Sequence, residues 1–465
     1  MEGDTMVLGD IVDRFEAKSP FCVMLRAALE NVLSEDRLNS IFEQNAQQQR
    51  NQDLMFSTVV DIMGSVACRI CPSVHAGYQA KIEEIGVTVK AVYDKLQRVE
   101  RNVSRAVVRE TAHQMAAIIR KTKGTLPELL PGLRVKIADG NHLRRTERRI
   151  AELREINGAP LPGHALVVWD AELGLASDVL PCEDGHSQER TLLPELLESV
   201  SYRDVWIADR NFCTSAFLFG IFQRRAYFVI RQHARNLPYE LIGKRKRLGT
   251  TNTGVVYEQS MRIFNKQGES KTVRRITVQL HQATRDGDTE IHILTNLPKR
   301  IHAIQISELY RERWTIETAF QEVAENLHGE VVSLGYPKAA LFAFCMALVS
   351  YNMLSVIKAA MRAAHGTETV EDGLSIYYVA DEIAHTYRGM EVAIPATYWQ
   401  KQYSELSPAK LARELVRIAK TVTLRRYRKH KRGSKKPTKT MNKVKRNHVS
   451  TARIIENRKS ATNAV

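Results

Sequence analysis

The sequence predicts an α/β protein in which a mixed β-sheet is flanked by helices and interrupted by a β-rich insertion. Three observations support this fold class. Residues 1–125 carry apolar clusters among helix-forming residues. From about residue 133, short apolar runs of strand type alternate with helical segments, which indicates a mixed sheet. Residues 232–295 have hairpin patterns, and residues 370–420 are again helical in pattern.

Each element of the mixed sheet is expected from its own local pattern. Strands are expected at 134–139, 164–170, 174–180, 204–209 and 226–231, with helices at 190–200 and 215–224. In the insertion, 254–264 and 272–280 form a hairpin and 289–295 a further strand. One helix is expected at 305–326, followed by an apolar helix.

These elements divide the chain into a helical N-terminal region (1–125), a mixed-sheet domain (130–357) with its insertion (232–295), a helical C-terminal region (358–420) and a tail (421–465). The net charge is +16, and from Lys420 onward 16 Lys and Arg residues face one acid, Glu456. Such a tail is typical of a polyanion-binding arm, with Arg425 and Arg426 as candidate contacts. We expect it to be flexible without DNA. A solubilising terminus is the alternative.

The composition argues against a secreted or membrane protein. Six scattered cysteines form no disulfide framework, which fits a reducing compartment, and the Cys68–Cys71 pair is expected to be two buried thiols. Residues 339–357 lack charges and are long enough for a membrane span. Because this run contains Ser350 and Asn352 and follows a charged helix, we expect a buried core helix. Without a signal-peptide pattern, a cytoplasmic location is expected.

Residues 80–99 have the pattern of a helix-turn-helix. A first helix is expected to end at Gly86, and a second follows with Val92 and Leu96 on its apolar face. Lys90 lies off that face and is a candidate DNA contact, since the second helix of this motif enters the major groove. An ordinary helical hairpin would show the same pattern.

Two predicted strands end in an acid followed by a loop, at Asp139 and at Asp209. Strand ends of open α/β sheets border the ligand crevice, and Gly140 is expected to let the backbone turn away from the first carboxylate. Two acids on neighbouring strands repel each other unless a cation lies between them. Carboxylates without His or Cys neighbours suit Mg²⁺ or Mn²⁺.

A third acid is expected from the helix 305–326. At about 100° per residue, Tyr310, Arg313 and Glu317 share one stripe. Arg313 is one turn from Glu317 and can orient that carboxylate or grip a phosphate. An exposed ion pair is the alternative. Two metals ~3.5–4 Å apart on such acids activate a water or a 3′-hydroxyl for displacement at phosphorus.

The polyanion indicated is a polymeric nucleic acid. The sequence has no Gly-rich Walker loop for a nucleotide, and no Gly-x-Ser-x-Gly elbow or clear Ser-His-Asp order. The insertion carries a basic run at 244–247 and Arg274-Arg275, so Lys244, Arg245 and Arg274 are candidate contacts to a phosphate backbone. The basic run could equally be a solvated loop.

These residues resemble the motifs of the DDE transposases of bacterial insertion sequences. The segment Tyr310-x2-Arg313-x3-Glu317 is similar to that family's Tyr-Arg-Glu-Lys signature. Asp139-Gly-Asn-His-Leu143 and Ala208-Asp-Arg-Asn-Phe212 resemble its first and second aspartate motifs. The order Asp, Asp, β-insertion, Glu also matches, and the resemblance covers about residues 130–357.

The resemblance implies a ribonuclease-H-like core that cleaves insertion-sequence ends and transfers the strands into target DNA. It implies two Mg²⁺ or Mn²⁺ ions on Asp139, Asp209 and Glu317, with Tyr310 and Arg313 near the DNA end. The expected partners are double-stranded DNA (terminal inverted repeats, recognised by the N-terminal helices, and target) and a second copy of the chain in the synaptic complex. A bacterial, nucleoid-associated location follows.

Two departures from the family pattern stand out. The signature lysine falls on Ala324, and Arg300 or Lys338 are the candidates to replace it. Some members stack a flipped base on a Trp of the insertion, but residues 232–295 hold none, which leaves Tyr257 or Phe264. Two other functions remain open: a structure-specific nuclease on the same core, and a DNA-binding regulator without catalysis.

Overall fold

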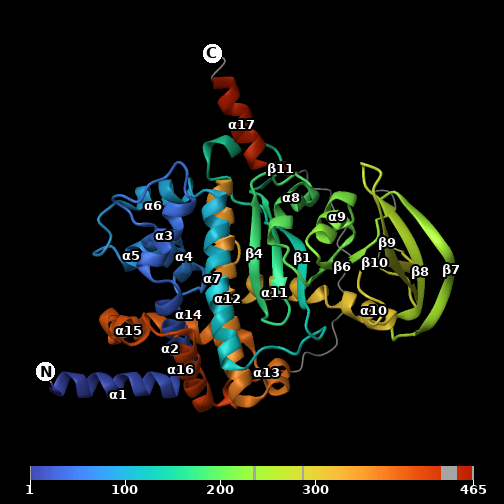
Figure 1. Ribbon diagram of the computed structural model, residues 1–465. Coiled ribbons are helices and arrows are strands. Elements are labelled where there is room, and N and C mark those ends of the chain that lie inside the picture. The colour runs from blue at the N-terminus through green and yellow to red at the C-terminus, as the bar shows by residue number, and fades with distance from the viewer. Residues whose placement is uncertain (1, 234–236, 285–286, 431–447, 463–465) are drawn as a thin grey trace.

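A computed structural model of the chain describes residues 2–233, 237–284, 287–430 and 448–462. Its centre is a nine-stranded sheet of order β4-β3-β1-β5-β6-β10-β9-β8-β7, with a helical body on one side and a β-ribbon extension on the other (Figure 1). The strands are β1 Arg134–His142, β2 Ala159–Leu161, β3 His164–Asp170, β4 Leu175–Cys182, β5 Asp204–Ala208, β6 Tyr227–Arg231, β7 Tyr239–Thr250, β8 Gly254–Phe264, β9 Ser270–Leu280, β10 Glu290–Thr295 and β11 His448–Ser450. The predicted α/β class is confirmed.

The first half of the sheet has the arrangement expected of a ribonuclease-H-like core. β3 and β4 form an antiparallel hairpin beside β1, and β1, β5 and β6 run parallel. The register pairs Ala138 of β1 with Ala208 of β5. As a result, the residues that follow these two alanines emerge side by side at one end of the sheet.

Strand alternation gives the sheet two apolar faces. Val135 and Ile137 belong to the larger core, which the sheet shares with the central helices. Ala138 and Trp206 belong to a second core, which also contains Leu196 and Phe217 of the helices on the opposite face. Because successive side chains point to opposite faces, residue 139 has the same orientation as Ile137 and faces the larger core side.

The helical regions before and after the sheet are confirmed. The N-terminal helices are α1 Glu2–Lys18, α2 Pro20–Val32, α3 Glu35–Asn45, α4 Phe56–Ala67, α5 Val74–Ala80, α6 Val89–Leu96 and α7 Arg101–Thr122. Those of the sheet domain are η1 Ala151–Leu153, η2 Glu189–Leu192, α8 Leu193–Leu196, η3 Leu197–Ser199, η4 Arg210–Phe212, α9 Ser215–Gln223, α10 Ala303–Arg311 and α11 Trp314–Asn326. The remainder are α12 Pro337–His365, α13 Thr367–Gly373, α14 Ile376–Ala393, α15 Ala396–Tyr403, α16 Pro408–Thr421, η5 Leu424–Tyr427 and α17 Thr451–Thr462.

Three predicted helices differ from the observed ones. The first helix of the predicted helix-turn-helix ends at Ala80 and not at Gly86, with turns between it and α6. The segment 190–200 is a succession of short 3-10 and α turns, interrupted near Pro194. The predicted helix 305–326 is two helices, because the chain turns between α10 and α11 at Glu312 and Arg313.

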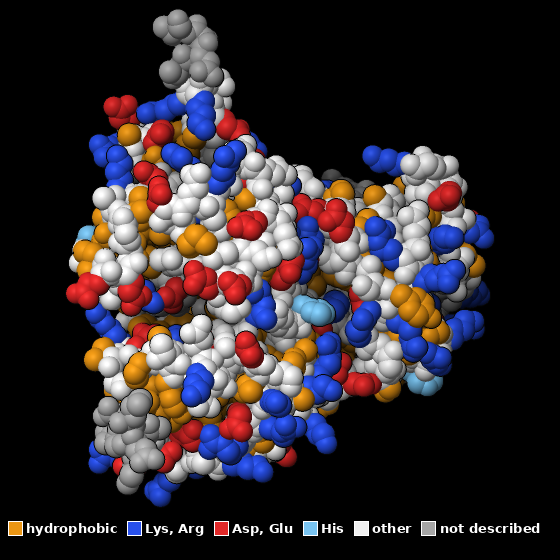
Figure 2. Space-filling model, turned by 60° about the vertical axis from the view of Figure 1, so that its left-hand side comes forward, with side chains coloured by type: hydrophobic (Ala, Val, Ile, Leu, Met, Phe, Trp, Pro, Cys, Tyr) orange, Lys and Arg blue, Asp and Glu red, His pale blue; other side chains and the backbone are white. Residues whose placement is uncertain are grey.

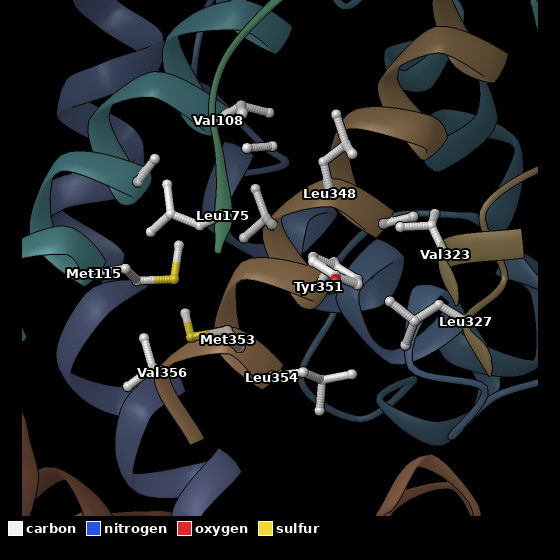
Figure 3. Close-up of a cluster of buried hydrophobic side chains, with 14 of the residues drawn as sticks. Val108, Met115, Leu175, Val323, Leu327, Leu348, Tyr351, Met353, Leu354 and Val356 are labelled. Atoms are coloured by element: carbon white, nitrogen blue, oxygen red, sulfur yellow. The ribbon is translucent and has the colours of Figure 1, made fainter. Parts of the chain in front are cut away.

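The apolar run is the buried core helix that the sequence predicts. α12 is long and apolar enough to cross a membrane, but its apolar window is entirely buried within the protein. Figure 3 shows side chains of α7, β4, α11 and α12 meeting in this core, including Leu175, Val323 and Leu348. Tyr351 of α12 donates a hydrogen bond to Glu322 of α11 at 3.0 Å. α12 therefore fixes the position of α11 against the sheet.

The β-rich insertion continues the central sheet. β10 pairs with β6 and carries β9, β8 and β7 outward from it. The predicted hairpin at 254–264 and 272–280 is confirmed. The alternative of a solvated loop at 244–247 is wrong, because these residues lie within β7, whose pairing with β8 is interrupted by irregularities. β7 is solvent-exposed along most of its length.

The end of the basic tail has a fixed place in the fold. Residues 448–462 of the tail have a place in the described structure, while residues 431–447 lie outside the described residues, so the flexibility of the tail stays a prediction. β11 pairs in parallel with β2. Asp184, which follows β4, accepts hydrogen bonds from Ser450 at 2.7 Å and from Arg453 at 2.7 and 2.9 Å. Strand pairing and these ion-pair contacts hold this segment against the sheet domain.

Candidate active site

Asp139 and Asp209 lie side by side on neighbouring parallel strands. Each follows the paired alanines Ala138 and Ala208, and adjacent strands are ~4.8 Å apart. The Asp209 side chain accepts a hydrogen bond at 2.7 Å from the backbone N–H of Asn211 and so caps the short helix η4. Strand register therefore brings together the two aspartates that the sequence singled out.

The explanation for Gly140 that the sequence favoured is wrong. β1 does not turn away after Asp139 but continues to His142, pairing with β3 at Gly140 and beyond. Gly140 instead leaves space for a neighbouring side chain. A Cβ at this position would lie 1.9 Å from Oε1 of Glu189. The absent side chain makes room for another carboxylate.

Arg313 joins the third predicted acid to the first. It lies at the turn between α10 and α11, and its Nη1 is 2.8 Å from Asp139 Oδ2 and 2.9 Å from Glu317 Oε1. Both carboxylates thus contact the same guanidinium nitrogen. The alternative of a purely exposed Arg313–Glu317 pair is wrong, since the Arg313 side chain is only 12% exposed and also binds Asp139. Glu317 itself is 41% exposed.

The other aromatic and basic residues of the motif surround Arg313. Tyr310 is buried, and its hydroxyl interacts with Arg313. Trp314, by contrast, is 58% exposed, and the Arg313 guanidinium lies 4.7 Å from its ring centroid. Ala324, the position of the missing lysine, is exposed, and its carbonyl accepts a hydrogen bond from Arg69. No local sequence pattern predicts that Arg69 lies here.

The site is electrostatically poised for a cation. Burial raises the pKa of Asp139 to about 7; Arg313 opposes this rise, and the charges of Asp209 and Glu189 add to it. Burial also raises the pKa of Asp209, against the hydrogen bond from Asn211, and Glu189 again adds to the rise. Removing carboxylates from water without enough positive charge favours their protonated forms.

The chemistry of this donor set fits a hard divalent cation. The groups are carboxylates, without His or Cys ligands beside them, which suits Mg²⁺ or Mn²⁺. Among the described residues, no three His, Cys, Asp or Glu side chains are already spaced to hold a metal ion. The guanidinium of Arg313 instead contacts Asp139 and Glu317 with its own positive charge.

Glu189 is the site residue that sequence reasoning missed. It begins η2, after the loop that follows β4, and its Oε2 accepts a hydrogen bond from Asn211 Nδ2 at 3.1 Å. Its charge acts on both Asp139 and Asp209. Only the close contact with Gly140 could have pointed to it, and that contact joins residues 49 positions apart.

Some candidate DNA-binding residues are solvent-exposed, and others already bind groups within the protein. Arg274 is buried, and its guanidinium binds Glu258 and the carbonyls of Leu297, Pro298 and Ile301. The donors of Arg274 are used within the protein, which argues against a DNA contact at this residue. Arg245 is partly engaged within the protein. Its Nη1 lies 2.9 Å from Glu290 Oε1, and its guanidinium carbon lies 3.8 Å from the ring centroid of Tyr257.

The remaining basic candidates are solvent-exposed. Lys90 lies on α6, Lys244 on β7, and Arg425 and Arg426 on η5, although Arg426 also donates to the carbonyl of Lys18 at 3.1 Å. Lys and Arg side chains gather on the right-hand lobe of the face in Figure 2, where acidic side chains are few. These positions are accessible to a polyanion.

Comparison with known proteins gives two matches to this chain. Residues 131–353, just under half of the chain, match the family described as "Transposase DDE domain". A protein of Sinorhizobium fredii (strain NBRC 101917 / NGR234), named "Putative transposase y4zB", is 29% identical over 156 residues. That alignment covers 32% of this chain and 42% of the relative, so the chain matches less than half of the relative's length.

Proposed function

We propose that this chain is a DDE transposase that cleaves DNA at insertion-sequence ends and joins those ends to target DNA; the matches to the transposase domain and to the putative transposase support this proposal. The observation that carries this proposal is the convergence of Asp139, Asp209 and Glu317 around Arg313. Three segments far apart in the sequence, two strands and a helix, contribute these acids. We propose them as the ligands of two Mg²⁺ or Mn²⁺ ions.

The metal ions, when bound, supply Lewis acidity for the attacking and leaving oxygens of a displacement at phosphorus. Asp139 and Asp209, carried by rigid neighbouring strands, give a fixed pair of oxygen ligands, and Glu317 approaches from α11. Arg313 Nε is buried and has no hydrogen-bond partner within the part of the chain that the structure describes. In this proposal the Arg313 guanidinium, beside the buried Tyr310, contacts a DNA phosphate.

Trp314 supports a further contact at the DNA end. A large aromatic side chain that is 58% exposed next to the proposed active site offers a stacking surface for an unpaired base. Tyr257, which the sequence suggested for this role, lies under Arg245 instead. In this proposal Lys90 and α6 recognise the terminal repeat, Lys244 and the tail grip the backbone, and two copies of the chain synapse the two ends.

The test is cleavage and strand transfer of DNA that carries the inverted repeats flanking the gene. Asp209→Asn keeps the size of the side chain but removes its charge. We expect it to retain DNA binding and lose cleavage by more than the ~10–100-fold that loss of an outer-shell partner costs. Glu308→Gln, an exposed acid of α10, is the matched control and should remain active.

The two alternative functions give different results in the same assay. A structure-specific nuclease would cut the DNA but form no joined product with a target plasmid. A non-catalytic regulator would show no metal-dependent cleavage, and Asp209→Asn would leave its function unchanged. Either result would overturn the proposal.

A further inference from the structure

We propose that Glu189 is a fourth acidic residue of the active site, a positioning residue whose charge increases the affinity of the Asp139–Asp209 pair for divalent cations. This inference rests on the proposed function and adds a residue outside the three-acid motif. The carboxylate of Glu189 lies against Gly140, directly after Asp139, and binds Asn211, two residues after Asp209. It thus contacts both segments that carry the aspartates, strand β1 and the turn after β5.

Gly140 leaves the space that the Glu189 carboxylate occupies. Its φ is not in the left-handed region, so backbone conformation does not require glycine here. The atoms nearest to an added Cβ are Oε1, Cδ and Cγ of Glu189, at 1.9, 2.5 and 3.1 Å. A methyl group at position 140 would therefore displace the Glu189 carboxylate from its place against Gly140.

Asn211 links Glu189 to Asp209. Its backbone N–H donates to Asp209 Oδ1 at 2.7 Å, and its side-chain amide donates to Glu189 Oε2 at 3.1 Å. One residue therefore orients both carboxylates. Outer-shell partners of this kind hold metal ligands in position and tune the affinity for the ion.

The charge of Glu189 has no counter-ion of its own. Across the described ranges, no Lys, Arg or His nitrogen forms an ion pair with its carboxylate, whereas Arg313 is shared between Asp139 and Glu317. The charges of Asp209 and Glu189 act on Asp139, and that of Glu189 also acts on Asp209; the guanidiniums of Arg313 and Arg210 oppose this only in part, because the pKa of each aspartate stays raised. A divalent cation would relieve this repulsion, and Glu189 adds to the attraction.

The direct test is Mn²⁺ binding to the full chain. Titration calorimetry, or the electron paramagnetic resonance signal of free Mn²⁺, measures the dissociation constant. Glu189→Gln keeps a hydrogen-bond acceptor for Asn211 but removes the charge. We expect its dissociation constant for Mn²⁺ to rise about 10-fold or more. Glu198→Gln, an exposed acid of the same segment, should bind Mn²⁺ like the wild type. Glu189→Gln within 2-fold of the wild type would overturn the inference.

A double-mutant cycle tests the contact with Gly140 separately. Gly140→Ala alone should weaken Mn²⁺ binding, because the methyl group displaces the carboxylate. In a Glu189→Ala background the same substitution should cost little more, since the displaced group is gone. Fully additive effects would contradict the contact. Asp139→Asn separates a failure of the proposed function from a failure of the role of Glu189. If Asp139→Asn and Glu189→Gln both bind Mn²⁺ like the wild type, the proposed metal site itself is contradicted. If Asp139→Asn loses Mn²⁺ binding but Glu189→Gln does not, only the role of Glu189 is contradicted.

Discussion

At the scale of single residues, the charge state of Asp139 depends on what else is in the site. Among the described residues, the cation that forms an ion pair with it is Arg313, which it shares with Glu317. Burial outweighs this partner and raises the pKa of Asp139 to about 7. Asp139 is thus held partly protonated near neutral pH until a stronger cation replaces or supplements the guanidinium.

This raised pKa predicts a specific pH dependence of stability. Between pH 4 and 7 the folded protein keeps the Asp139 proton, whereas the unfolded chain, with an ordinary Asp pKa near ~3.9, has lost it. The folded state therefore binds more protons, and the contribution of this residue to the free energy of unfolding falls as pH rises, by at most about 1.4 kcal/mol per unit.

Urea unfolding in EDTA at several pH values measures this dependence. Subtracting the curve of Asp139→Asn from that of the wild type isolates the residue, and the difference should slope downward from pH 4 to 7. Saturating Mg²⁺ should flatten it in the wild type. Parallel curves for the two proteins without metal would show that Asp139 titrates normally.

Local patterns predicted some site residues and could not predict others. Asp139 and Asp209 follow short apolar strands, and Glu317 is one helical turn from Arg313, so each is visible within a few residues of sequence. Glu189 has no such pattern, because its partners come from two other strand ends. The burial of Arg274 was equally invisible, since a basic residue in an amphipathic strand has the same pattern whether it faces DNA or a neighbouring carboxylate.

At the scale of elements, helix α12 hydrogen-bonds to β4, the strand at one edge of the sheet. Asn352 is fully buried, and its side-chain amide accepts from the N–H of Ala176 and donates to its C=O, both at 2.8 Å. Ala176 belongs to β4, the edge strand of the nine-stranded sheet. The amide thus takes the place of a neighbouring strand at the point where β4 meets the core helix.

Asn352→Leu should strongly destabilise the protein. Leucine has a similar volume but leaves a buried N–H and a buried C=O without partners, at about 1–3 kcal/mol for each group. We expect a loss of about 2–6 kcal/mol in the free energy of unfolding, measured by urea denaturation. Ser350→Ala is the control, because the Ser350 hydroxyl donates to the carbonyl of Met346 in its own helix and interacts with the Cys68 thiol after α4, whereas Asn352 pairs with the sheet. An equal effect of both substitutions would show that the pairing with β4 contributes nothing.

The breaks between elements were less predictable than the elements themselves. Periodicity predicted helix from 305 to 326 without interruption, yet the chain turns at Glu312 and Arg313. The turn carries Arg313 to Asp139, a contact between residues 174 positions apart. β7 was missed for a related reason: its exposed, basic sequence has no apolar alternation, and pairing with β8 alone makes it a strand.

At the scale of the whole molecule, the excess of positive charge lies in the C-terminal tail and not in the body of the protein. The body of the protein is nearly neutral, and the excess of positive charge lies from Lys420 onward. The far end of this tail, β11 and α17, is fixed to β2 and to Asp184 of the sheet domain. On the two sides of residues 431–447, which lie outside the described residues, the structure describes η5 and β11.

This arrangement predicts how DNA affinity depends on salt. A chain ending at His430 lacks eleven Lys and Arg residues and one acid. Each phosphate contact contributes about 0.9 to the slope of log K against log salt, so the slope should fall by about 2 or more if the tail binds DNA. Fluorescence anisotropy with a duplex of unrelated sequence, between low and physiological salt, measures this slope.

A second variant separates the charge of the tail from its docking. Asp184→Asn removes the carboxylate that holds Ser450 and Arg453 but keeps every basic residue of the tail. Its salt dependence should stay close to that of the wild type, because counterion release depends on the number of phosphates contacted and not on where the tail is anchored. If the chain ending at His430 also keeps the wild-type slope, the tail makes no phosphate contacts and serves only as a solubilising terminus.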